Sequence, residues 1–209
     1  MENSTFELPP VKGIEGVMAE VKAWGLKTCR ERLIGVRGTG ERVFDVLGEE
    51  DRVDLPQEWI GKGQGVWLVH CHPSIPTELS IPDFECVVSL EAAGNVAVAC
   101  DDETVSWSRG PNLAKATSWA FESGTSLDRL FTNLALRAWD ERATSILRTY
   151  CFDVWGKEKC LRFDETSEVF NKEFVVMAHE GNKLLLRKGM LKDYHVRLGN
   201  RAKGLLQLV

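Results

Sequence analysis

The chain has 209 residues, with 26 Lys or Arg against 31 Asp or Glu, which gives a formal net charge of −5 at pH 7. Hydrophobic residues make up 44% of the sequence and charged residues 27%, a mixture typical of one globular domain, or of one domain with an extension. This composition excludes a collagen-like, disordered or disulfide-dense protein. The acidic balance also gives no electrostatic reason to bind nucleic acid.

Neither a secretory signal nor a membrane span is expected. The first ten residues lack a cationic stretch followed by an apolar one. No apolar run approaches the roughly 20 residues that cross a bilayer. We therefore expect a cytoplasmic protein without membrane partners. The six cysteines include no Cys-x-x-Cys pair, so we interpret them as small buried hydrophobic residues.

The first part of the chain predicts one helix followed by strands. Apolar side chains recur on one helix face over residues 13–24, and Gly25 is expected to end that helix. Two short strands, 31–36 and 42–47, flank a Gly-Thr-Gly turn and predict a hairpin. Residues 66–69 form a continuous apolar run, typical of a central strand covered on both faces.

The same patterns continue toward the C-terminus. A helix is expected to begin after Ser80, a good N-cap, and to end at Gly94. Three further elements are expected: strands over 96–100 and 104–108 and a long helix over 127–150.

The last part of the chain differs in pattern, with strand-like segments at 174–178 and 184–187. We expect a domain over residues 10–150 and treat 151–209 as a C-terminal extension of unknown role. The order helix, strands, helix, strands, helix predicts an α/β (α+β) fold, a mixed sheet flanked by helices.

The informative segment joins the central strand to the next helix. His70 and His72 stand one residue apart at the strand end, so the alternation of a strand points both imidazoles to one side. Asp83 offers a carboxylate from the first turn of the following helix, and the loop 73–79 is long enough to fold that turn back. Two imidazoles, one carboxylate and an open fourth position are typical of a catalytic zinc site. Cys71 points to the opposite side and is expected in the core.

The spacing His-x-His, seven residues, Ser-x-x-Asp resembles the signature of the JAMM (MPN+, JAB) zinc metalloproteases at every defined position. The order of predicted elements over about residues 13–150 is similar to that of the MPN domain. The resemblance does not extend over 151–209. It implies an MPN/JAB-like mixed sheet flanked by helices.

Family members also carry an upstream glutamate in a pattern like Glu-x-x-Gly-x-x-x-Gly, and Glu31 is the nearest fit. Gly38 matches the second glycine, whereas Ile34 stands at the first. Glu41 and Glu58 are the other candidates for this position.

The resemblance implies a zinc-dependent protease or isopeptidase. His70, His72 and Asp83 would hold Zn²⁺, Glu31 would be the general base toward the zinc-bound water, and Ser80 would donate a hydrogen bond to the oxyanion. Family substrates often contain the C-terminus of ubiquitin, of a ubiquitin-like protein or of a sulfur-carrier protein, so a partner of that kind is expected.

Other interpretations stay open. Some MPN domains are non-catalytic scaffolds or binding proteins in larger assemblies, which the imperfect Glu31 pattern favours. The Val-His-x-His-Pro-Ser run also resembles the RadC family and implies a DNA-associated protein, against which the acidic charge counts. Ser80-x-x-Asp83 is close to an ordinary capping box as well. His179 and His195 lack ligand spacing and are interpreted as surface or satisfied histidines.

Overall fold

The computed structural model describes residues 6–50, 52–111, 168–187 and 189–207, so the helix expected over 127–150 lies outside it. In chain order the described elements are α1 (Ile14–Thr28), β1 (Arg32–Arg37), β2 (Arg42–Leu47), the 3-10 turn η1 (Gln57–Trp59), β3 (Val66–His72), α2 (Ile81–Leu90), β4 (Gly94–Ala99), β5 (Val105–Pro111), α5 (Glu168–Arg187), β6 (Leu191–Arg197) and α6 (Asn200–Gln207). No helix among them has the length and apolar character that crossing a membrane requires.

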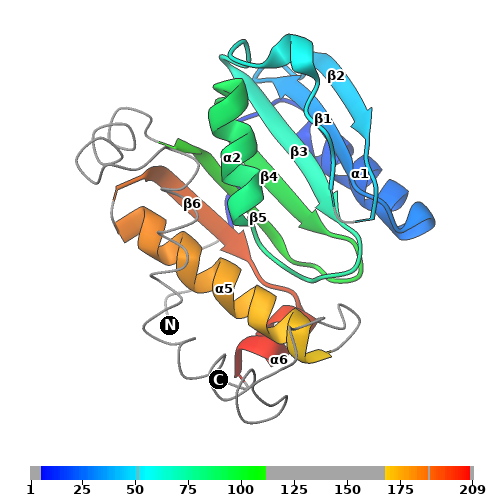
Figure 1. Cartoon of the computed structure of the whole chain (residues 1–209), viewed down its shortest axis with the longest axis vertical. Helices are drawn as coiled ribbons and strands as arrows, with labels where there is room; N and C mark the ends of the chain where they lie inside the picture. The colour runs from blue at the N-terminus through cyan, green and yellow to red at the C-terminus, as the bar shows by residue number, and fades with distance from the viewer. Residues whose placement is uncertain (1–5, 51, 112–167, 188, 208–209) are drawn as a thin grey trace, which may run out of the picture.

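The described strands form a six-stranded sheet in the order β2-β1-β3-β4-β5-β6 (Figure 1). Strands β3 and β4 are parallel, and the other neighbouring pairs are antiparallel. Helix α2 is the crossover between the two parallel strands, which short hairpins cannot join. The predicted mixed sheet flanked by helices is therefore confirmed.

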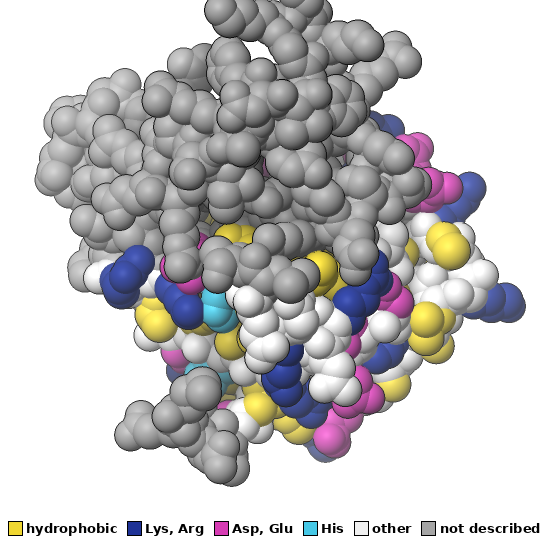
Figure 2. Space-filling view, turned by 90° about the horizontal axis from the view of Figure 1, so that it is seen from below, with side chains coloured by type: hydrophobic (Ala, Val, Ile, Leu, Met, Phe, Trp, Pro, Cys, Tyr) yellow, Lys and Arg dark blue, Asp and Glu magenta, His cyan; other side chains and the backbone are white. Residues whose placement is uncertain are grey.

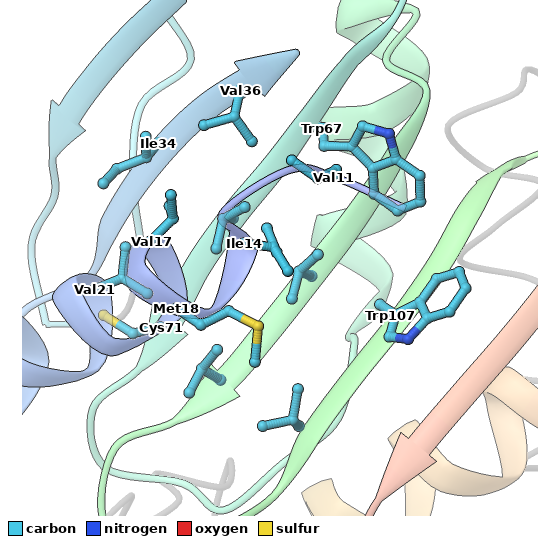
Figure 3. Packing of buried hydrophobic residues seen from close by; sticks show 14 of the residues in the cluster. Val11, Ile14, Val17, Met18, Val21, Ile34, Val36, Trp67, Cys71 and Trp107 are labelled. Atoms are coloured by element: carbon cyan, nitrogen blue, oxygen red, sulfur yellow. The ribbon is translucent and has the colours of Figure 1, made fainter. Parts of the chain in front are cut away.

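Helix α1 covers one face of this sheet and packs on its buried apolar residues (Figure 3). The predicted end of this helix at Gly25 is wrong, because α1 continues to Thr28 and ends at Cys29 in a left-handed conformation. A Cβ at Gly25 would lie 3.0 Å from the Sγ of Cys71 and closer still to that of Cys100. The glycine therefore lets the helix approach the sheet rather than stopping it.

Helix α2 packs on the opposite face, over a second apolar cluster that includes Leu33, Leu68 and Leu90. The predicted end of this helix at Gly94 is also wrong. The helix ends at Leu90, where Glu91 takes the left-handed conformation, and Gly94 begins β4 instead. A Cβ at Gly94 would meet the Trp67 ring at 2.5 Å, so this glycine allows close packing across neighbouring strands.

The strands expected at 174–178 and 184–187 are wrong, because both segments lie within α5. A short apolar run does not distinguish a strand from a buried helix. The buried positions Val175, Ala178, Asn182 and Leu185 recur at helical spacing. Strand β6, which the sequence analysis missed, pairs with β5 and so places part of 151–209 in the same sheet. The division at residue 150 stays a prediction.

Candidate metal centre

Strand β3 directs the two histidines toward the face of the sheet that α2 covers. His70 lies opposite Leu33 of β1, and Leu33 belongs to the apolar cluster under α2. Cys71, between the histidines, belongs instead to the cluster under α1, as predicted (Figure 3). Because side chains alternate along a strand, His70 and His72 share the α2 face. Both are nearly fully buried.

The start of α2 presents the carboxylate. Ser80 is the N-cap, and its backbone N–H donates to Asp83 Oδ2 at 2.6 Å while its hydroxyl donates to the same oxygen at 2.7 Å. Ser80 and Asp83 thus form a capping box, as their spacing allows. This local role fixes the Asp83 side chain in the first turn, where it also reaches the two histidines.

The three predicted ligands converge. His70 Nε2 lies 2.9 Å from Asp83 Oδ1, His72 Nε2 lies 3.6 Å from Asp83 Oδ2, and the two Nε2 atoms lie 3.0 Å apart. One ligand atom from each residue falls within 4.8 Å of the others. Ligand atoms around one tetrahedral zinc ion are about 3.3 Å apart, so these atoms fit a single cation after small movements.

The charges of the cluster also fit a cation. Burial would raise the pKa of Asp83, but the neighbouring His70 and His72 imidazoles hold it well below the usual 3.8. Burial would lower the pKa of His70, yet the Asp83 carboxylate raises it above 6.5. The carboxylate therefore stays ionised and favours positive charge beside it. Two facing ring nitrogens need a shared proton or a cation between them, and a metal ion meets that need.

Two further residues contact the predicted ligands, Thr77 at His72 and Asn95 at Asp83. The carbonyl oxygen of Thr77 lies 3.4 Å from His72 Nδ1, the ring nitrogen turned away from the cluster. The Asn95 side chain donates to the Asp83 carbonyl oxygen at 2.9 Å and so holds the first turn of α2, which carries the carboxylate. Metal-binding histidines usually have such partners on the second nitrogen. Neither residue carries a sequence signal, since its role depends on strand register and loop path.

Glu31 lies at the same end of the sheet. It precedes β1, and continuing the register that places Leu33 opposite His70 puts Glu31 opposite His72. Its backbone N–H donates to the Glu49 carbonyl at 2.7 Å, which extends the pairing beyond β2. Burial raises the pKa of Cys86 to about 12, and the negative charges of Asp83 and Glu31 add to that effect. The carboxylates of Glu31 and Asp83 thus both add negative charge at this end of the sheet.

The other two glutamate candidates lie elsewhere. Glu41 forms an ion pair with Arg37, the last residue of β1. Arg37 lies opposite Val66, the first residue of β3, whereas the histidines lie at the other end of that strand. Glu58 belongs to η1. Just after η1, the backbone N–H of Gly61 donates a hydrogen bond to the carbonyl of Ser89, near the C-terminal end of α2. Asp83 is at the N-terminal end of that helix. Of the three, Glu31 is the one at the histidine end of the sheet.

The remaining two histidines contact groups other than the candidate ligands. His195 stacks on the Trp107 ring, with ring centroids 4.1 Å apart and planes 10° apart. His179 of α5 contacts Glu78 in the loop before α2, with 2.6 Å between Nδ1 and Oε1. No local pattern indicates that His179 reaches the loop between the metal ligands.

Comparison with known proteins gives no relative: the chain matches no protein-family model, no curated protein and no solved structure.

Proposed function

We propose that this chain is a zinc-dependent hydrolase of amide or isopeptide bonds, of the JAMM type. The observation that carries the proposal is the convergence of His70, His72 and Asp83 at one buried strand end, in the order and spacing of the JAMM signature. Three protein ligands leave a fourth position for water, which is typical of catalytic rather than structural zinc.

The roles of the other residues follow from their places around the ligands. A bound zinc ion would lower the pKa of its water toward neutrality. Glu31, at the His72 end of the sheet, would accept a proton from that water and return it to the leaving amine. Ser80, whose hydroxyl donates to Asp83 at 2.7 Å, would rotate to donate a hydrogen bond to the oxyanion. The Thr77 carbonyl would keep the His72 imidazole in place, and Asn95 would hold the first turn of α2 that carries Asp83.

A protein is the proposed substrate. The family resemblance points to the C-terminus of ubiquitin, of a ubiquitin-like protein or of a sulfur-carrier protein, in the cytoplasm. The net charge of −5 argues against a nucleic-acid substrate. In the described part of the face shown in Figure 2, acidic and basic side chains are interspersed rather than gathered into a basic stripe.

The test is hydrolysis by the full, zinc-loaded chain of a fluorogenic amide at the C-terminus of such proteins. We expect cleavage by the wild type, and a loss of about 10²–10⁴-fold in turnover for Glu31→Gln with the metal retained. Glu41→Gln, at the opposite end of β1, is the matched control and should keep full activity. Full activity of Glu31→Gln would assign the base role to another residue. No cleavage by the loaded wild type would favour the non-catalytic scaffold.

A further inference from the structure

A second polar cluster lies beside the candidate metal centre, in the loop between its ligands. Glu78 is completely buried, and a buried carboxylate is costly unless it is paired. His179 Nδ1 lies 2.6 Å from Glu78 Oε1, and Asn182, one helical turn later on α5, points its Nδ2 at Oε2 from 3.4 Å. Helix α5 therefore supplies one partner to each oxygen of this carboxylate.

The same helix also holds the loop backbone. Asn182 Nδ2 donates to the Leu79 carbonyl at 2.8 Å, and the Leu79 N–H donates to Ser106 Oγ of β5 at 2.7 Å. Leu79 is thus fixed from both sides, by the helix and by the sheet. The segment 76–79 is buried throughout.

This fixed segment touches the metal ligands at both of its ends. On one side of Glu78, the Thr77 carbonyl faces His72 Nδ1 at 3.4 Å. On the other side, Leu79 is followed by Ser80, which caps α2 and bonds the Asp83 carboxylate. A displacement of Glu78 would therefore move the partner of His72 and the start of the helix that carries Asp83.

We propose that α5 supports the metal centre, with Glu78, His179 and Asn182 as positioning residues that fix the loop between its ligands. The inference rests on the metal site of the proposed function. It adds that metal affinity depends on a helix from the part of the chain that the JAMM resemblance does not cover. Partners outside the ligand shell commonly change metal affinity by about 10–100-fold.

The test measures the dissociation constant of Co²⁺ and its visible absorption spectrum in the full chain. We expect His179→Ala and Asn182→Ala to raise that constant by about 10–100-fold and to change the spectrum, because His72 and Asp83 lose their fixed geometry. His179→Asn, which keeps an N–H donor near Glu78, should recover most of the affinity. The double variant Glu78→Gln/His179→Ala should bind Co²⁺ no more weakly than the weaker binder of the two single variants, Glu78→Gln and His179→Ala, since the pair acts as one unit.

His195→Ala is the matched control for general destabilisation. His195 stacks on Trp107, which belongs to the cluster under α1, so it lies on the face of the sheet opposite the loop. Its loss should lower the free energy of unfolding while leaving the Co²⁺ constant within about twofold. An equal loss of affinity in His195→Ala and His179→Ala variants of equal stability would overturn the positioning role. So would unchanged binding in every α5 variant. No binding by the wild type would instead refute the metal site itself.

Discussion

Replacing Gly25 with Ala tests how α1 packs on the strand that carries the histidines. The added Cβ would lie 3.0 Å from the Sγ of Cys71 and closer still to that of Cys100, and both sulfurs are buried. Forcing extra volume into a packed core costs about 1–3 kcal/mol. Alanine is favoured over glycine inside a helix by about 1 kcal/mol. We therefore expect a net loss of up to about 2 kcal/mol in the free energy of unfolding.

Gly16 on the same helix is the matched control, because it is exposed and an added Cβ there meets nothing within 4 Å. Gly16→Ala should raise the free energy of unfolding by about 0.5–1 kcal/mol. Urea unfolding followed by circular dichroism measures both variants. The double variant Gly25→Ala/Cys100→Ala should lose less free energy of unfolding than the two single variants lose together, since Cys100→Ala removes the nearest sulfur. A Gly25→Ala variant as stable as Gly16→Ala would refute this account of the packing.

Three more predictions concern the scaffold and use the same urea assay. Burial alone would raise the pKa of Asp102, but hydrogen bonds from Thr104 and from the start of α6 lower it. The ionised Asp102 carboxylate therefore stabilises the fold above pH 3.8, and this stabilisation is lost as the pH falls below that value. Asp102→Asn should therefore lower the free energy of unfolding at neutral pH and make that free energy decrease less steeply in acid. An equally steep decrease below pH 3.8 in the wild type and the variant would count against this. Leu90→Ala, in the cluster under α2, should cost about 2–5 kcal/mol, and a cost under about 1 kcal/mol would mean that this face is loosely packed. Arg42→Ala breaks a half-exposed pair with Glu20 and should cost less than about 1 kcal/mol, so a larger loss would contradict the surface assignment.

Local patterns predicted the elements that position the candidate site. Alternation along β3 placed His70 and His72 on one face, and the capping signal at Ser80 placed Asp83 in the first turn of α2. Strand alternation and helix capping each depend on residues only a few positions apart, so both can be predicted from the local sequence. The loop 73–79 is long enough to allow the convergence of the three ligands, and contacts with β5 and α5 fix its path.

The predictions fail where the position of a residue depends on neighbours far away in the chain, or where a pattern is too short to distinguish a helix from a strand. The local pattern predicts that Gly25 ends a helix, but the atom nearest to a Cβ added at Gly25 is the Sγ of Cys100, 75 positions later in the chain. The apolar run 174–178 is too short to show the helical spacing of α5, so its pattern predicts a strand. The contact between Glu78 and His179 joins segments 101 positions apart, and neither segment signals the other.

The central claim is that His70, His72 and Asp83 bind one metal ion, and metal content tests it most directly. We would measure zinc by elemental analysis in the purified wild type, His72→Ala and Asp83→Ala, with Ser74→Ala, an exposed loop residue, as the control. The account predicts about one zinc per chain in the wild type and in Ser74→Ala, and almost none in the other two variants. A wild type that holds no zinc after reconstitution, or ligand variants that keep a full equivalent, would contradict it.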